Sequence, residues 1–323
     1  MPSVLVTRPL PPPGAAALRD AGLEVRESST DAPLDRHELL AGVRGMDALL
    51  CMLTDRVDSE VFDAAPSLSI VANFAVGFDN VDVAEAARRG IVVTNTPDVL
   101  TEATADLAWA LLLAAARRVG EGDQLVRGGS WAGWSPTQLL GAPVHGATLG
   151  IVGLGRIGTA VARRSRGFDM DVCYTSRRRH EAAELETGAR YVALEELLRS
   201  SDVVSLHAPL DETTRHLIDE VALGSMKPTA VLVNTARGAL VDEDALVRAL
   251  RDGTIAAAGL DVFEREPALA TGLRELPNVV LAPHIGSATT QARAAMVKLC
   301  CDNIVRVLAG RPPLTPVRPE ATG

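Results

Sequence analysis

The sequence is short of lysine and carries no surplus of positive charge. Only Lys227 and Lys298 are lysines, so arginine supplies nearly all of the basic side chains. The 41 acidic residues outnumber the 32 basic ones, and the formal net charge is −9. Because no basic excess is available to neutralise phosphates, nucleic acid is not expected as a partner.

Long apolar runs, paired cysteines and several catalytic motifs are also missing. The best apolar run, Leu107–Ala116, is well short of the roughly 18 residues that a membrane span needs. The N-terminus has no basic region before its short apolar stretch, so neither a membrane anchor nor a secretory signal is expected. The four cysteines form no CxxC pair, which fits a reducing cytoplasm. Without a Walker loop, an HExxH helix or a nucleophile elbow, NTPase and hydrolase classes lack support, and no metal is expected.

Short β-rich runs alternate with Ala- and Leu-rich helical stretches along the chain. This alternation predicts an α/β fold in which parallel sheets are covered by helices on both faces. The expected helices include Ala15–Ala21, Ser59–Ala64 and Val83–Arg89. The expected strands are Val4–Thr7, Asp47–Met52, Ser69–Asn73, Ile91–Thr94, Thr148–Val152, Asp171–Thr175, Asp202–His207, Ala230–Asn234, Ala257–Asp261 and Asn278–Ala282.

Two long helical stretches, Thr101–Arg118 and Thr289–Leu308, interrupt the alternation, and Thr101 is a candidate cap for the first. A length of 323 residues suggests two domains. The expected domains are residues 1–98 with 288–323, and residues 99–287. The sequence alone does not show whether the last helix returns to the first domain.

A glycine-rich turn, Gly153-Leu-Gly155-Arg-Ile-Gly158, follows one expected strand and opens a helical stretch. This context is what the dinucleotide-binding fingerprint requires. Gly153 permits a tight turn, Gly155 lets the backbone approach a pyrophosphate, and Gly158 lets the helix pack on the strand. The N–H groups at the start of the helix then face the phosphates.

The end of the next strand lacks the acidic residue that NAD-binding proteins use for the ribose 2′-hydroxyl. The chain reads Ser176-Arg177-Arg178-Arg179 there. The planar fork of arginine matches the oxygens of a 2′-phosphate. The sequence therefore favours NADP(H), and NAD(H) remains possible.

Polar side chains follow the last expected strands, at the edge where open α/β sheets bind ligands. Arg237 suits a carboxylate and a polarised carbonyl. His284 suits proton delivery, and Glu266 can orient the imidazole and favour its charged form. This set predicts hydride transfer to an anionic keto acid. His207, also at a strand end, is a rival to His284.

At these residues the chain resembles the D-isomer-specific 2-hydroxyacid dehydrogenase family, over nearly its whole length. Within the family it most resembles the glyoxylate/hydroxypyruvate reductases, through Thr96–Asp106 and Tyr174–Arg177. The segments that carry the family resemblance are Asn73–Asn80, Gly153–Gly158, Asn234–Gly238, Gly259–Pro267 and Pro283–Thr289.

The resemblance implies two Rossmann-like or flavodoxin-like domains with a cleft between them, the substrate domain being discontinuous. It also implies a homodimer that reduces glyoxylate or hydroxypyruvate. Arg237, Glu266 and His284 would be catalytic. The implied substrate-binding residues are Leu53, Ala75, Val76 and Gly77 (the last three through their N–H groups), Trp134, Arg237 and His284. The implied cofactor-binding residues are Thr104, Gly153, Gly155, Arg156, Ile157, Gly158, Ser176, Arg177, Arg178, His207, Pro209, Thr213, Thr235, Ala236, Asp261 and Gly286.

Several alternatives stay open. The irregular segment 120–146 resembles a dimerisation loop, in which Trp134 either reaches the partner's active site or only fills the interface with Trp131. The substrate could instead be 2-ketogluconate, phosphohydroxypyruvate or another 2-keto acid. A dinucleotide-sensing corepressor is a further reading, since fold does not fix function, although the intact Arg237, Glu266 and His284 set speaks against it.

Overall fold

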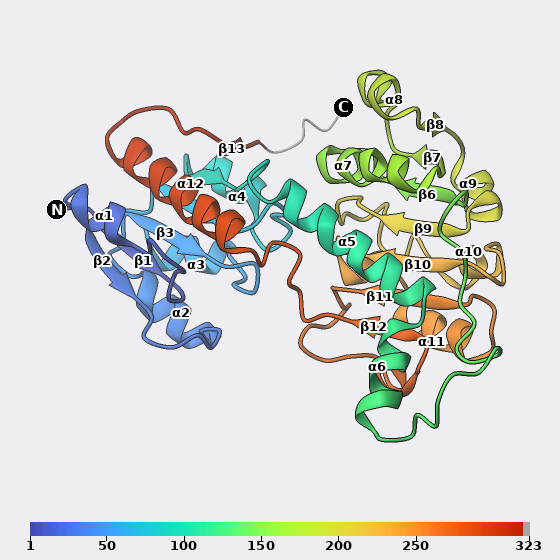
Figure 1. The fold of residues 1–323 in the computed structure, drawn as a ribbon. Helices are drawn as coiled ribbons and strands as arrows, with labels where there is room; N and C mark the ends of the chain where they lie inside the picture. The colour runs from blue at the N-terminus through green and yellow to red at the C-terminus, as the bar shows by residue number, and fades with distance from the viewer. Residues whose placement is uncertain (319–323) are drawn as a thin grey trace. The chain divides into compact units, whose positions relative to one another are not determined.

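The computed structural model describes residues 1–318, and the chain divides into two compact units (Figure 1). The first contains Met1–Leu100 and the described residues from Ala288, and the second contains Thr101–Ser287. The long C-terminal helix α12 (Thr290–Leu308) therefore belongs to the first unit, a point that the sequence left open. The two units are divided after Leu100 and after Ser287, whereas the divisions expected from the sequence lie after 98 and after 287.

The first unit is built on a six-stranded sheet of order β13-β5-β4-β3-β1-β2. All pairs are parallel except that of β13 with β5. The 2-1-3-4-5 order of the first five strands is flavodoxin-like, with its topological switch between β1 and β3. The strands are β1 (Ser3–Val6), β2 (Glu24–Glu27), β3 (Ala48–Cys51), β4 (Ile70–Asn73), β5 (Val92–Thr94) and β13 (Pro316–Val317). The shorter helices are α1 (Ala16–Asp20), α2 (Arg36–Val43), α3 (Ser59–Ala64) and α4 (Val83–Arg88).

The second unit contains a seven-stranded sheet of order β12-β11-β10-β9-β6-β7-β8, in which every pair is parallel. This is the dinucleotide-binding order, with its switch point between β6 and β9. The strands are β6 (Thr148–Val152), β7 (Asp171–Thr175), β8 (Arg190–Tyr191), β9 (Val203–Leu206), β10 (Val231–Asn234), β11 (Ala257–Leu260) and β12 (Val279–Leu281). The α-helices are α5 (Thr101–Ala116), α6 (Val119–Arg127), α7 (Arg156–Ser165), α8 (Glu181–Thr187), α9 (Leu194–Ser200), α10 (Glu220–Gly224) and α11 (Glu243–Arg251).

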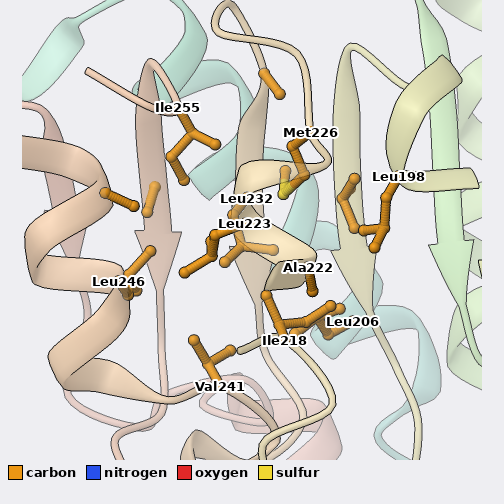
Figure 2. Packing of buried hydrophobic residues seen from close by; sticks show 14 of the residues in the cluster. Leu198, Leu206, Ile218, Ala222, Leu223, Met226, Leu232, Val241, Leu246 and Ile255 are labelled. Atoms are coloured by element: carbon orange, nitrogen blue, oxygen red, sulfur yellow. The ribbon is translucent and has the colours of Figure 1, made fainter. Parts of the chain in front are cut away.

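Apolar clusters cover both faces of the second sheet. Leu232 of β10 belongs to the cluster drawn in Figure 2, together with Leu223 of α10 and Leu246 of α11. Its neighbours Val231 and Val233 belong to the opposite cluster, which also contains residues of α5 and α7. Both faces of this strand are therefore buried, which explains why it reads as an unbroken apolar run. The expected α/β class with parallel sheets is confirmed.

The structure adds elements that the sequence did not reveal, mainly at sheet edges. Strands β2 and β8 are edge strands with exposed or half-buried residues, so they lack the apolar run of a central strand. Strand β13 lies in the Pro-rich tail and α6 in the segment expected to be irregular. Thr101, expected as a cap, is instead the first residue of α5. Helix α2 does carry a readable signal, the capping box of Asp35 and Glu38.

Among residues 1–318, no helix combines the length and the apolar character needed to cross a bilayer. The same residues include no group of three or more His, Cys, Asp or Glu side chains placed to hold a metal ion.

Candidate active site

The glycine turn lies at the switch point of the second sheet. A Cβ on Gly153, whose φ is +96°, would lie 2.7 Å from the carbonyl carbon of His207. A Cβ on Gly158 would lie 2.2 Å from the carbonyl oxygen of Gly153, so helix α7 packs directly against the turn. By contrast, no described atom lies within 4 Å of the Cβ position of Gly155. The turn is therefore tight on the protein side and open where a pyrophosphate would approach, with Arg156 and Ile157 at the start of α7.

His207 follows β9 and lies beside this turn. Its N–H donates to the Val152 carbonyl at 2.7 Å, and its Nε2 lies 2.8 Å from Oγ of Ser205. Burial lowers the pKa of His207 to about 4, so the imidazole is neutral at pH 7. A neutral ring held by a serine is poorly suited to donate a proton, which favours His284 over its rival.

The loop after β9 also contains Pro209 and Thr213. The Pro209 carbonyl accepts a hydrogen bond from Oγ1 of Thr214 at 2.8 Å. The N–H and hydroxyl of Thr213 donate to Oδ1 of Asp211 at 2.9 and 2.6 Å. Both expected cofactor residues are thus on the same edge of the sheet as the glycine turn, in a loop ordered by its own hydrogen bonds.

The arginine-rich loop after β7 divides into two parts. Arg179 makes two hydrogen bonds of 2.8 Å to Glu184 of α8, and Tyr174 donates to the same carboxylate at 2.6 Å. The bonds from Arg179 and Tyr174 lower the pKa of Glu184 to about 2. Arg179 is therefore part of the local structure. Arg177, 3.4 Å from Asp211, and Arg178 are exposed, and the Ser176 hydroxyl donates to the Arg178 carbonyl.

Glu266 and His284 meet at the carboxyl ends of β11 and β12. Oε2 of Glu266 lies 2.8 Å from Nδ1 of His284, and Oε1 accepts the N–H of Phe263 at 3.0 Å. Burial works to raise the pKa of Glu266, but the hydrogen bond and charge of His284, helped by the Phe263 N–H and the charge of Arg237, hold it below its usual value. The carboxylate stays ionised, and the bond to Nδ1 leaves Nε2 as the nitrogen that can face a substrate.

The turn that carries His284 is held by Asp261, which is fully buried. Its two carboxylate oxygens accept the N–H groups of Ile285 and Gly286, each at 2.7 Å. His284 itself has a φ of +55°, and its N–H donates to the Asp261 carbonyl at 2.8 Å. A left-handed conformation costs a non-glycine residue about 1–2 kcal/mol, and these bonds offset that cost. Burial raises the pKa of Asp261.

Gly286 has a further reason to lack a side chain. A Cβ there would lie 3.2 Å from Oδ2 of Asp261 and 3.4 Å from Cγ2 of Thr104. This close approach places Thr104 of α5 beside the turn after β12. Two expected cofactor residues from distant parts of the sequence are thus neighbours.

Arg237 follows β10 in a turn organised by Asn234. The Asn234 side chain donates to the Arg237 carbonyl at 2.8 Å and accepts the Ala236 N–H at 3.0 Å. Arg237 Nη1 donates to the Ala236 carbonyl at 2.8 Å. Oγ1 of Thr235 is buried and has no hydrogen-bond partner anywhere in the described chain. A buried unsatisfied hydroxyl is costly, and a bound polar ligand would satisfy it.

In the first unit, Leu53 and the segment Ala75–Gly77 follow the neighbouring strands β3 and β4. The Ala75 N–H donates to the Asn73 carbonyl at 2.8 Å, so it is already used within the turn. Within residues 1–318, the N–H groups of Val76 and Gly77 have no protein acceptor. These two remain the candidate donors to a substrate carboxylate.

Residues 109–286 match the family model described as "D-isomer specific 2-hydroxyacid dehydrogenase, NAD binding domain". The chain belongs to this family. It is an NAD(P)-dependent dehydrogenase that acts on small 2-keto or 2-hydroxy acids.

Two curated relatives, both named glyoxylate reductase, come from Thermococcus onnurineus and Thermococcus kodakarensis. They are 53% and 54% identical to this chain, over 99% of its length and 96% and 97% of theirs. A solved structure from Thermus thermophilus is 48% identical, with a TM-score of 0.92, and covers 98% of this chain and 99% of its own. A solved structure of an NADPH-dependent glyoxylate/hydroxypyruvate reductase from Sinorhizobium meliloti, in complex with NADP and malonate, is 38% identical with a TM-score of 0.84. It covers 98% of this chain and 96% of its own.

The tryptophan-containing segment of this dehydrogenase lies on the surface of the second unit. Trp134 is 83% exposed and Trp131 is 53% exposed. Large apolar side chains are rarely left in solvent over one continuous segment, so this region is a candidate interface.

The sequence did not point to every residue that organises this dehydrogenase site. Asn234 fixes the turn before Arg237, and an Asn at the end of a strand is the signal that could have identified it. Glu243 was missed because it begins a helix, where an acidic residue is ordinarily a surface feature. Its contacts with the segment around Glu266 depend on tertiary structure.

Proposed function

We propose that this dehydrogenase reduces glyoxylate or hydroxypyruvate with NADPH and that His284 supplies the proton. The proposal rests mainly on the 2.8 Å contact between Nδ1 of His284 and Oε2 of Glu266. Both residues follow strands that come after Arg237 in the chain. The substrate class is supported by the similarity to the Thermococcus glyoxylate reductases and to the Sinorhizobium meliloti glyoxylate/hydroxypyruvate reductase.

The residues present fit a nicotinamide dinucleotide. The open backbone at Gly155 and the start of α7 would hold the pyrophosphate. The unsatisfied hydroxyl of Thr235 would gain a polar partner in the cofactor. Asp261, whose oxygens also hold the Ile285 and Gly286 N–H groups, would bind the nicotinamide carboxamide. When bound, the reduced cofactor supplies the hydride.

Arg237, Glu266 and His284, which follow β10, β11 and β12, then bind the substrate and supply the proton. Arg237 binds the substrate carboxylate and polarises the C2 carbonyl. His284, oriented through Nδ1, donates the Nε2 proton to the developing alkoxide. Glu266 stabilises the imidazolium, as its lowered pKa keeps it anionic. Leu53, Val76 and Gly77 remain proposed substrate contacts.

The preference for NADPH rests on Ser176, Arg177 and Arg178. Two exposed guanidinium groups and a hydroxyl follow the strand at the position where an acidic residue would bind the 2′-hydroxyl of NAD.

The proposal also includes a homodimer, supported by the exposed tryptophans, and a cytoplasmic setting, supported by the free thiols of the four cysteines.

The test follows the absorbance of NADPH and of NADH with purified protein, first with glyoxylate and then with hydroxypyruvate. Turnover with NADPH at a higher kcat/KM than with NADH supports both the substrate class and the cofactor preference. An Arg177→Ala/Arg178→Ala variant should lose the preference by weakening NADPH binding alone. Equal or better turnover with NADH contradicts the cofactor proposal, and no turnover with either acid contradicts the substrate proposal.

A further inference from the structure

A buried carboxylate that the mechanism above does not use lies behind the turn that carries Glu266. Glu243, the first residue of α11, is 5% exposed. Its Oε1 accepts the N–H of Glu264 at 2.7 Å, and its Oε2 accepts the N–H of Ala270 at 3.3 Å. These two donors lie on either side of Glu266 in the chain. One carboxylate therefore closes the base of the segment 264–270.

Inside this segment, the backbone makes a tight turn. The Ala268 N–H donates to the Arg265 carbonyl at 2.8 Å, so Glu266 and Pro267 form the tip. From that tip, the Glu266 carboxylate extends to His284. The direction of the Glu266 side chain thus follows from the backbone that Glu243 holds.

Two further contacts attach the same segment to its surroundings. The Glu264 carboxylate lies 3.0 Å from Nε2 of His216 and 3.3 Å from Nη1 of Arg215. A Cβ on Gly238 would lie 1.9 Å from the carbonyl carbon of Phe263. Because Gly238 directly follows Arg237, the backbone that carries the substrate-binding arginine packs on the segment that carries Glu266.

The two backbone N–H groups at Glu264 and Ala270 are matched by the two oxygens of a carboxylate at position 243. Burial raises the pKa of Glu243, and the charges of Glu264 and Asp244 add to this effect, while the two N–H donors oppose it. Acidic residues are favourable at a helix start, but they are ordinarily exposed there, whereas Glu243 is buried. Only a carboxylate of this length offers two acceptor oxygens and no donor, since glutamine replaces one oxygen by an NH₂ group.

We propose that Glu243 is a positioning residue that fixes the Glu266 turn so that its carboxylate stays aligned with His284. The inference rests on the proposed roles of Glu266 and His284. Asp261 and Arg237 are charged groups that interact with that pair, whereas the described hydrogen bonds of the Glu243 carboxylate are to the backbone of Glu264 and Ala270.

The test compares Glu243→Gln, Glu266→Gln and the double variant with the wild type, using kcat and KM across pH. Glu243→Gln should lower kcat by about 10- to 100-fold, the range expected for a misplaced reacting group, while KM for NADPH changes little. Its pH–rate profile should begin to fall at a lower pH than that of the wild type, as in Glu266→Gln, because the imidazolium loses its aligned counter-charge. Adding Glu243→Gln to Glu266→Gln should change kcat by less than about 2-fold, since both act through one interaction.

Asp242→Asn is the matched control. Asp242 caps the same helix by accepting the Ala245 N–H at 2.9 Å, so this variant perturbs α11 without removing a bond to the segment 264–270. It should keep the wild-type pH profile. Glu243→Asp, which keeps the charge but cannot span both donors, should behave like Glu243→Gln, and it replaces that variant if glutamine prevents folding.

The outcomes separate the two proposals. Additive losses in the double variant, an unchanged pH profile in Glu243→Gln, or a wild-type Glu243→Asp each overturn the positioning role. A Glu266→Gln variant with wild-type kcat and pH profile overturns the proposed catalytic pair instead, whatever Glu243→Gln does.

Discussion

At the scale of single residues, the two histidines beside the second sheet have opposite electrostatic settings. His284 is paired with an ionised carboxylate, whereas burial lowers the pKa of His207 from its ordinary 6.5 to about 4. Between these two pH values the unfolded chain binds the proton more readily than the native state. His207 therefore makes the protein less stable as pH falls from about 6.5 to about 4.

Replacing His207 by Asn should reduce this acid sensitivity. The urea midpoint of the wild type should fall between pH 7 and pH 4.5 by more than that of His207→Asn. His145→Asn, on an exposed side chain that pairs with Asp169, is the control and should follow the wild type. If His207→Asn and the wild type lose stability in parallel, the histidine is not held neutral by the fold.

A second prediction at this scale concerns the shape of the Arg237 side chain, tested by a substitution that keeps its charge. Arg237→Lys keeps the positive charge but loses the planar fork that matches a carboxylate. Loss of a charge-assisted hydrogen bond costs about 1.5–3 kcal/mol, so kcat/KM for the keto acid should fall by roughly 10- to 150-fold. Arg248→Lys, at an exposed pair with Glu220, should leave kcat/KM unchanged. Full activity in Arg237→Lys would mean that the guanidinium group of Arg237 does not bind the substrate carboxylate.

At the scale of elements, the glycine turn between β6 and α7 contains glycines with two different roles. Gly158 is needed for packing, and Gly155 is proposed to be needed for cofactor binding. Gly158→Ala places a methyl group 2.2 Å from the Gly153 carbonyl, so α7 must move. The expected cost is that of overpacking, about 1–3 kcal/mol, which lowers Tm by several degrees. Gly155→Ala meets no described atom within 4 Å, so Tm without cofactor should be unchanged while NADPH binding weakens. Thermal unfolding measures the Tm of each variant, and a fluorescence titration measures its NADPH binding. A lower Tm for Gly155→Ala together with an unchanged Tm for Gly158→Ala would contradict these roles.

The same scale shows what the sequence could and could not predict. Strands β6 and β7 and helix α3 have the expected bounds, because each is an apolar or amphipathic run with clear turn residues around it. The edge strand β2 was missed because half of its residues face solvent. His284 and Glu266 could be anticipated as neighbours, since both follow strands that pair in parallel. Glu243 could not, because its two partners are backbone groups brought to it only by the folded loop.

At the scale of the whole molecule, the question is how many chains make the active protein. Five of the ten exposed large apolar side chains of the second unit lie in one stretch of sequence: Val119, Val126, Trp131, Trp134 and Leu140. A single chain gains nothing from this exposure, whereas a second copy would bury it. Light scattering should therefore give about twice the chain mass of 34.0 kDa. A mass of one chain at micromolar concentration would contradict the dimer.

Trp134→Ala then distinguishes the two roles expected for this residue. If Trp134 reaches the partner's active site, the variant should remain a dimer while KM for the larger hydroxypyruvate changes by several-fold relative to glyoxylate. If Trp134 only fills the interface, the dimer should dissociate at higher protein concentration, with the ratio of the two KM values unchanged. Trp131→Ala is the matched comparison, because it removes the same kind of side chain from the same segment and is expected to weaken association alone. Equal effects of the two variants on the KM ratio would therefore exclude a specific substrate contact by Trp134.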